Sequence, residues 1–236
     1  MLLDIKHISY SLQWKNLIKD LSFSIEENTV ISIIGYNGSW KSTLLKLLLW
    51  SIEPDAWTII RSPDLNVGYV PQKLWFDHQL PLTVRDFIQI YNTDTKQKSS
   101  FSCSILNIKP ILDIPLSWLS GWQLQKVLIY NALLGEPKIL FLDEPTAGLD
   151  VLAQKEFYTL IEHVHQAHKV SIVLVSHDIH TVYSKSDSII CLHKGSCCTW
   201  SPKDKEFSQE VSTLLGWYVM PYVHSHDSSH NQIPSW

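Results

Sequence analysis

Two adjacent carboxylates at the end of an apolar run are the residues of this chain best suited to chemistry. Residues 139–142 are all apolar, and Asp143, Glu144 and Pro145 follow directly. A strand that is apolar on both faces belongs at the centre of a parallel sheet, and such sheets bind ligands beyond the carboxyl ends of their strands. One carboxylate there can hold Mg²⁺, and the next can accept a proton from an attacking water. A buried strand followed by two solvated acids explains this stretch, taken alone, equally well.

A second segment has the composition of a phosphate-binding loop. Residues 30–34 predict a strand, and a loop with two glycines leads into a helix that starts near Lys41. In such loops backbone N–H groups and a helix N-terminus hold phosphates, a lysine reaches the terminal phosphates and a hydroxyl binds Mg²⁺. Lys41 and Ser42 suit the last two roles. The candidate loop comprises Gly35, Tyr36, Asn37, Gly38, Ser39, Trp40, Lys41, Ser42 and Thr43.

Four more short segments lie around these two in a definite order. Gln72 precedes the acidic strand, and so does the stretch Leu119, Ser120, Gly121, Trp122 and Gln123. Asp150 and His177 follow it. An ordered set of this kind is far more specific than any of its members, and it makes the reading of an ordinary buried strand improbable.

With these six segments in place, the chain resembles the ATP-binding cassette (ABC) ATPases over nearly its whole length. The resemblance implies that residues 35–43 and 139–144 are the Walker A and B motifs and that 119–123 form the signature loop. It also implies ATP and Mg²⁺ as cofactors, with the metal held by Ser42, Asp143 and Gln72. Glu144, His177 and Gln72 would be the catalytic residues, and Asp150 the D-loop aspartate.

The resemblance also implies partners. Two copies of such an ATPase face each other, and each ATP lies between the Walker loops of one copy and the signature loop of the other. The chain is most similar to the zinc-importer branch, on residues 69–84, on the stretch from Cys191 to Cys198 and on a histidine-bearing tail. That branch implies a membrane-spanning permease and, indirectly, a periplasmic metal-binding protein. Residues 70–73 are shared with manganese and iron importers, so those ions stay open.

Tryptophans depart from the family pattern at two critical positions. Trp40 stands where the glycine before the Walker A lysine is expected, and Trp122 stands at the second glycine of the signature loop. An indole at position 40 adds bulk beside the phosphate-binding amides, and left-handed geometry there would add about 1–2 kcal/mol of strain. At Trp122 we expect the bulk at the dimer seam. A catalytically impaired nucleotide-binding scaffold is therefore an alternative. Trp57 and Trp200 also occupy expected glycine positions.

The predicted fold class is α/β, with a P-loop NTPase core, an antiparallel β subdomain and a small helical subdomain. Alternating apolar residues within 1–29 indicate an antiparallel strand pair. Residues 73–125 carry helix-like runs at 84–91 and 105–112, and a further helix is expected over 124–134. A helix beginning near Val151 has an apolar stripe, with His163, His165 and His168 on its solvent side. We assign 1–215 to the ATPase domain and 216–236 to a weakly ordered tail.

Composition limits the alternatives. The formal net charge of −4 without a basic run argues against a nucleic-acid partner. The longest apolar stretches are shorter than the ~18–20 residues of a membrane span, so we expect contact with a membrane only through partners. The family resemblance implies a peripheral protein on the cytoplasmic face of the inner membrane. A DNA-repair or translation ATPase of the same family would usually carry a coiled-coil insertion or a second cassette, and the sequence shows neither.

Two features leave alternatives open. Cys191, Cys197 and Cys198 lie near His193, and histidines recur in the tail, so either group could bind metal. For the cysteines a packed or surface role is favoured, because the spacing lacks a Cys-x₂-Cys pair. For the tail a solvated segment with incidental histidines is favoured. The aromatic residue that stacks on adenine is also undecided. The best-aligned position is Leu12, with Tyr10 and Trp14 close by.

Overall fold

The structure is a computed structural model. It describes residues 1–36, 38–74, 81–91, 106–177, 185–193 and 196–200. Among the helices of this described part, none is long and apolar enough to cross a lipid bilayer.

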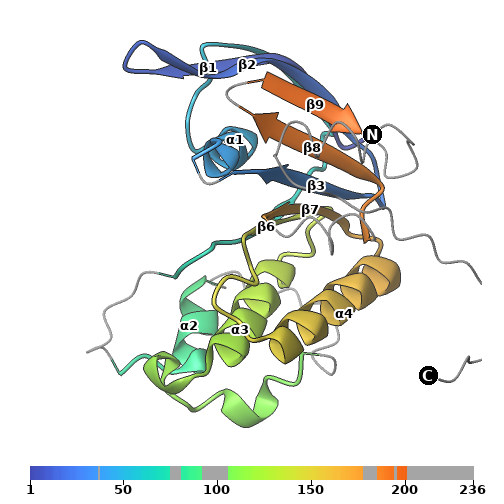
Figure 1. The fold of residues 1–236 in the computed structure, drawn as a ribbon. Helices are drawn as coiled ribbons and strands as arrows, with labels where there is room; N and C mark the ends of the chain where they lie inside the picture. The colour runs from blue at the N-terminus through green and yellow to red at the C-terminus, as the bar shows by residue number, and fades with distance from the viewer. Residues whose placement is uncertain (37, 75–80, 92–105, 178–184, 194–195, 201–236) are drawn as a thin grey trace, which may run out of the picture.

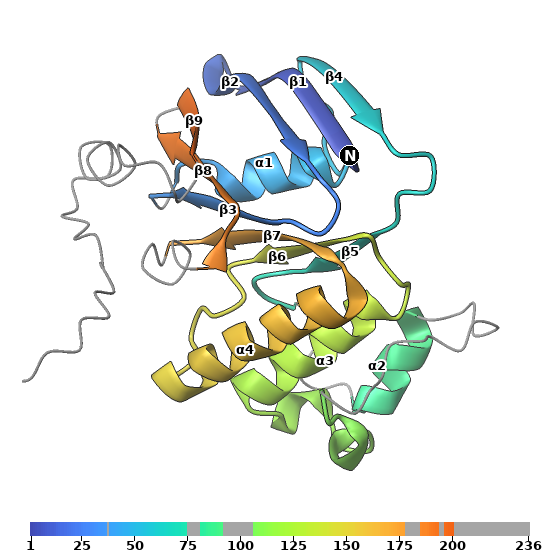
Figure 2. The same cartoon turned by 90° about the vertical axis from the view of Figure 1, so that its right-hand side faces the viewer.

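A six-stranded sheet forms the centre of the protein (Figures 1 and 2). Five of its strands run parallel and the last, β9, pairs antiparallel with β8. In spatial order the strands are β5 (Val67–Val70), β6 (Ile139–Asp143), β7 (Ser171–Ser176), β3 (Val30–Gly35), β8 (Ser188–His193) and β9 (Ser196–Trp200). The parallel order places the carboxyl ends of β3, β6 and β7 side by side, which is what a ligand site at that edge requires.

Different layers cover the two faces of this sheet (Figure 2). On one face lie α2 (Val84–Tyr91), α3 (Gly121–Leu133) and α4 (Val151–His168). On the other face lie α1 (Lys41–Leu48) and an antiparallel sheet of β2 (Lys15–Ile25), β1 (Leu3–Leu12) and β4 (Ala56–Arg61). The expected β1–β2 pair is confirmed, and β4 is a third strand that the sequence analysis did not anticipate.

Strand β6 alternates between two hydrophobic cores. Leu140 and Leu142 pack in the core beneath α3 and α4. Ile139 and Phe141 pack in the core shared with α1 and β1. All four side chains are 0% exposed, and burying each stabilises the fold by roughly 1.5–3 kcal/mol. The prediction that this strand is buried on both faces is confirmed.

Helix α4 presents the predicted apolar stripe to the core. Its buried residues are Ala153, Phe157, Leu160, Ile161 and Val164. The prediction for its histidines was only partly right. His163 is exposed, but the His165 Nδ1 atom lies 2.9 Å from the Val170 carbonyl oxygen, and His168 is half-buried. Burial, followed by the nearby His163, lowers the pKa of His168. His165 and His168 are less exposed than predicted because the chain turns back against the end of α4.

The helical subdomain is more irregular than its sequence suggested. Helix α2 has the predicted bounds, whereas the run expected over 105–112 is, in its described part, only the 3₁₀ turn Lys109–Ile111. Pro110 accounts for this, since a proline within the run removes a helix hydrogen bond and clashes with the preceding turn. A second 3₁₀ turn spans Leu116–Trp118. Helix α3 begins at Gly121, three residues earlier than expected, because Ser120 and Gln123 form a capping box.

Candidate nucleotide-binding site

The loop between β3 and α1 places a lysine in the protein interior. Lys41, the first residue of α1, is only 4% exposed. Its Nζ atom donates hydrogen bonds to the carbonyl oxygens of Gly35 at 2.8 Å and Tyr36 at 3.0 Å. It also lies 3.7 Å from the Glu144 Oε1 atom. Burial lowers the pKa of Lys41, although Glu144 and Asp143 oppose that shift.

A hydroxyl and a carboxylate meet beside this lysine. The Ser42 hydroxyl donates to the Asp143 Oδ1 atom at 3.4 Å, which links α1 to the end of β6. Asp143 is 6% exposed, and burial together with the neighbouring Glu144 raises its pKa. The Ser42 hydroxyl and the Asp143 carboxylate both present oxygen atoms, which are the ligands that Mg²⁺ prefers. The donor set therefore fits a magnesium ion.

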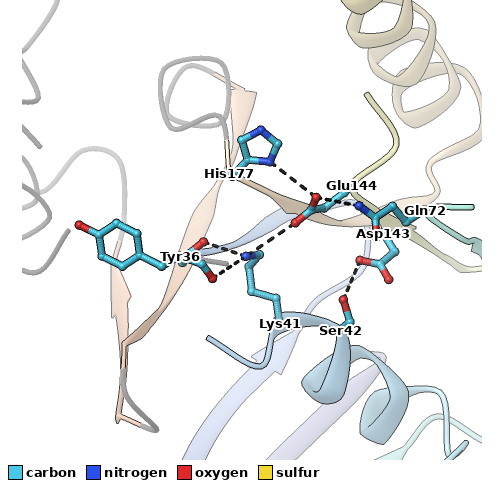
Figure 3. Close-up of polar contacts among 8 residues, drawn as sticks. Tyr36, Lys41, Ser42, Gln72, Asp143, Glu144 and His177 are labelled. Atoms are coloured by element: carbon cyan, nitrogen blue, oxygen red, sulfur yellow. Dashed lines mark hydrogen bonds and ion pairs between the residues drawn. The ribbon is translucent and has the colours of Figure 1, made fainter. Parts of the chain in front are cut away.

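Side chains from three other parts of the chain lie next to the Glu144 carboxylate (Figure 3). Its Oε2 atom accepts a hydrogen bond from the Gln72 Nε2 atom at 3.1 Å and lies 3.6 Å from the His177 Nδ1 atom. Its backbone is held as well, because its N–H donates to the Val175 carbonyl oxygen at 3.0 Å and its φ angle is 42°. A non-glycine residue in this left-handed region is held there by its surroundings, and such residues cluster at functional sites.

Six predicted residues thus lie together at the carboxyl edge of the sheet. Gln72 follows β5, Asp143 and Glu144 end β6, and His177 follows β7, while Lys41 and Ser42 open α1. No spacing in the sequence specifies these contacts, because the residues are separated by up to 136 positions (177 − 41) and only the parallel strand order aligns them.

The signature loop and the D-loop aspartate are held by their own elements. The Ser120 hydroxyl accepts the Gln123 N–H at 3.2 Å, and the Gln123 side chain accepts the Ser120 N–H at 2.9 Å. Asp150 is the N-cap of α4 and accepts the Ala153 N–H at 2.8 Å. Both residues begin helices that cover the same face of the sheet. Their roles toward nucleotide stay predictions.

Trp40 adopts the geometry that its position was suspected to need. It is the N-cap of α1 with φ 72° and ψ 23°, a left-handed conformation, and its side chain makes no capping hydrogen bond. The indole lies toward the β1–β2 hairpin, where the Lys15 Nζ atom is 5.3 Å from the ring centroid. Lys15 was missed by sequence reasoning, since nothing in its spacing links it to the loop.

Trp122 packs on α4, with its Nε1 atom donating to the Glu156 Oε2 atom at 2.7 Å. Its place at a dimer seam stays a prediction. The ring meets Phe157 edge-on, with centroids 6.4 Å apart, and Lys126 lies 5.4 Å from its centroid. Glu156 and Lys126 were also missed. Lys126 lies one helical turn after Trp122, which is a sequence signal for their contact, whereas no spacing links Glu156 to Trp122.

The remaining candidates are only partly described. Tyr10 packs partly buried on the core, Leu12 is 52% exposed and the Trp14 side chain is fully exposed, so the adenine-stacking residue stays open. Cys191 is buried in β8 and, among the described residues, no cluster of three or more metal-ligating side chains occurs. Asn37, Cys103 and the tail from 216 to 236 lie outside the described residues, as do the side chains of His193, Cys197 and Cys198.

The fold and the clustered residues define a P-loop nucleoside triphosphatase of α/β architecture. The sequence profile of the ABC transporter family matches residues 18–147, more than half of the chain. The chain therefore belongs to the ABC transporter family, as the motifs predicted.

Individual relatives cover nearly the whole chain. The zinc import ATP-binding protein ZnuC of Buchnera aphidicola subsp. Schizaphis graminum is 38% identical over 97% of this chain and 98% of its own length. The protein of the same name from Pseudomonas syringae pv. syringae is 33% identical over 98% of this chain and 89% of its own. A solved dimeric ATP-binding cassette bound to ADP and phosphate has the same fold, with a TM-score of 0.70, 22% identity and coverage of 86% and 100%.

Proposed function

We propose that this protein is the ATP-hydrolysing subunit of an importer and that it drives the uptake of zinc. The observation that carries the enzymatic part is the convergence of Lys41, Ser42, Gln72, Asp143, Glu144 and His177 at one edge of the sheet. Phosphoryl transfer to water needs positioned positive charge, a metal site and a group that orients or deprotonates the water. This cluster contains a candidate for each.

The proposed roles follow from the contacts. Lys41 reaches the terminal phosphates once it exchanges its carbonyl partners for phosphate oxygens, which are stronger, charged acceptors. Ser42, Asp143 and Gln72 would hold Mg²⁺, which would neutralise charge on the phosphates. Glu144 accepts the proton of the attacking water, while His177 and Gln72 orient its carboxylate. The N–H groups of 35–43 complete the phosphate cradle.

A second copy of the chain is proposed to complete the site. In this scheme Ser120 and Gly121 of that copy cap the terminal phosphate across the seam, and the D-loop residue Asp150 lies between the two sites. The N-cap position of Ser120 supports this role, because the positive end of the α3 dipole then lies at the signature loop. Closure and opening of the dimer would supply the transport work.

The proposed cargo and partners rest on the relatives. Two named zinc import proteins match at 33–38% identity over almost their full length. We therefore place the chain on the cytoplasmic face of the inner membrane, bound to a permease and served indirectly by a periplasmic metal-binding protein. The ATPase domain is assigned to 1–215 and the histidine-bearing tail to 216–236, as the sequence analysis predicted.

The test is transport by the protein reconstituted with its permease in proteoliposomes. ATP-dependent accumulation of Zn²⁺, lost in Glu144→Gln, is the expected result. Accumulation of Mn²⁺ or Fe²⁺ in preference to Zn²⁺ would overturn the cargo but keep the enzyme. Glu144→Gln transport equal to that of the unchanged protein would overturn the proposed catalytic role.

A second candidate function has one specific observation in its favour. Trp40 places an indole in a left-handed residue of the phosphate loop, so the chain could serve as a nucleotide-binding scaffold with little turnover. Measurement of ATP hydrolysis beside the Trp40→Gly variant separates the two functions. Turnover that is equal in both proteins excludes an impairment caused by the indole.

A further inference from the structure

Three tryptophans of this chain occupy backbone conformations that suit glycine. Trp14, Trp40 and Trp50 have φ angles of 66°, 72° and 54°. Side chains clash with the backbone in this left-handed region, and for a bulky residue the conformation is a genuine outlier. Glycine has no Cβ atom and adopts it freely. Composition points the same way, since the chain has ten Trp and only eight Gly, about half of the average Gly usage of roughly 7%.

Trp14 stands in a two-residue hairpin turn. Strand β1 ends at Leu12, β2 begins at Lys15, and these two residues are paired across the hairpin. The connecting residues Gln13 and Trp14 have φ angles of 47° and 66°. Two positive φ angles define a type I′ turn, whose second position is dominated by glycine. The Trp14 side chain is fully exposed, so no packing compensates for the strain.

Trp50 stands just beyond the end of α1. Its N–H donates to the Leu47 carbonyl at 3.1 Å, and the Ser51 N–H donates to the Lys46 carbonyl at 2.8 Å. With Leu49 as the C-cap, this pair of bonds is the Schellman motif, in which a left-handed residue follows the cap. Glycine is the residue most often found there.

Trp40 stands in a third, unrelated motif. It is the left-handed residue between the phosphate loop and α1, and the phosphate-loop pattern has glycine at this place. A hairpin turn, a helix end and a phosphate loop share no contact that would require the same large side chain. All three do require a residue without a Cβ clash. One cause that acts on the gene explains the three positions together.

We propose that the polypeptide made in its own cells carries glycine at positions 14, 40 and 50. The cause would be decoding: the codon UGA is read as tryptophan in some genetic codes and as glycine in others. A gene whose UGA codons mean glycine yields tryptophan at these positions when they are read by a tryptophan code. Trp57, Trp118 and Trp122 have negative φ angles and lie outside this proposal.

The consequence for the site is direct. Glycine at position 40 removes the indole from beside the phosphate-loop amides and leaves the backbone geometry unchanged. The inference rests on backbone conformation and not on the proposed function, so each can fail without the other.

The decisive experiment is mass spectrometry of peptides from the protein purified from its own cells, together with the codons of its gene. The expected result is UGA at all three positions and peptide masses with glycine there. Tryptophan masses, or UGG codons, at 14, 40 and 50 would overturn the proposal.

A stability comparison tests the physical premise on recombinant protein that carries tryptophan. Trp14→Gly and Trp50→Gly should each raise the folding equilibrium constant about three- to tenfold, because left-handed strain is removed. Trp118→Gly is the matched control, since Trp118 is 79% exposed but lies in a 3₁₀ turn with negative φ. It should lower the constant. Equal effects at all three positions would remove the backbone argument and with it the proposal.

Discussion

The two places where tryptophan interrupts a family motif are built in opposite ways. At the phosphate loop, Trp40 has a left-handed backbone, and the structure provides one nearby cation, Lys15, over its ring. At the signature loop, Trp122 lies within α3 at negative φ. There it has a hydrogen bond to Glu156 and an aromatic contact with Phe157.

The difference teaches that the same residue change has different costs in different backbones. At position 40 the conformational strain is about 1–2 kcal/mol, and the indole stands next to the groups that would bind phosphate. At position 122 a helical backbone accepts any side chain with a Cβ atom, and packing on α4 stabilises the indole. We therefore expect the tryptophan at position 40, and not the one at position 122, to impair nucleotide binding.

The largest expected effect is the loss of ATP turnover when the proposed catalytic base is removed, and it does not depend on either tryptophan. In a Trp40→Gly background, Glu144→Gln should reduce ATP turnover by about 10²–10⁴-fold while nucleotide affinity stays nearly unchanged, because the base is lost and the shape is kept. The readout is steady-state hydrolysis together with equilibrium binding.

Glu156→Gln serves as the control for that experiment. This residue contacts Trp122 on the signature side, and the amide oxygen still accepts the indole N–H. Turnover should stay within about threefold of the background, well below the general-base effect. More than a tenth of the activity remaining in Glu144→Gln would count against the role of Glu144.

The next effect compares nucleotide affinity at the two loops. Trp40→Gly should tighten ATP–Mg²⁺ binding to the isolated chain by at least about tenfold, which corresponds to 1.4 kcal/mol. Trp122→Gly should change the same affinity little, because in the proposed dimer the signature loop acts on the nucleotide of the opposing copy. Parallel titrations of the three proteins measure both. Equal affinities of the unchanged chain and Trp40→Gly would show that the loop tolerates the indole.

Substitution at position 122 should change the stability of the fold for the worse, whereas substitution at position 40 should not. Trp122→Ala should lower the free energy of unfolding by about 1–2 kcal/mol, less than the ~3–5 kcal/mol of a fully buried aromatic, because the side chain is only partly buried. Trp40→Gly should raise this free energy by about 1 kcal/mol, as at positions 14 and 50, because the relief of left-handed strain exceeds the cost of glycine flexibility in the unfolded chain. Urea denaturation of both variants measures this. A larger loss at position 40 than at 122 would invert the comparison.

The smallest effect is a pH dependence at the end of β6, beside the phosphate loop. Burial raises the pKa of Asp143 above its ordinary value, so its contribution to stability is present below the unfolded pKa and is lost as pH rises through the folded pKa. Asp143→Asn should therefore stabilise the nucleotide-free, magnesium-free protein at neutral pH, with a gain that shrinks as pH falls. Thermal unfolding across this range gives the answer. A gain that grows toward low pH would mean that Asp143 is stabilised in its charged form.

Local signals in the sequence determined much of the fold. The apolar run of β6, the stripe of α4 and the two-strand pattern of β1 and β2 were all predicted and confirmed, because period and burial are encoded in neighbouring residues. The family was also readable, because its motifs are short and their order is specific. Errors arose where local rules competed, as at 105–112, where proline overrode an apolar helical pattern.

The sequence alone could determine which residues belong to the site, because residue type shows which side chains can bind phosphate, hold a metal or accept a proton. Only the tertiary structure decided their geometry, because the parallel order of β5, β6, β7 and β3 brings Gln72, Glu144, His177 and Lys41 together across long stretches of chain. The tertiary structure also decided how Trp40 and Trp122 are accommodated. Whether an indole strains a loop or packs on a helix depends on φ angles and on neighbours such as Lys15 and Glu156, which lie far away in sequence.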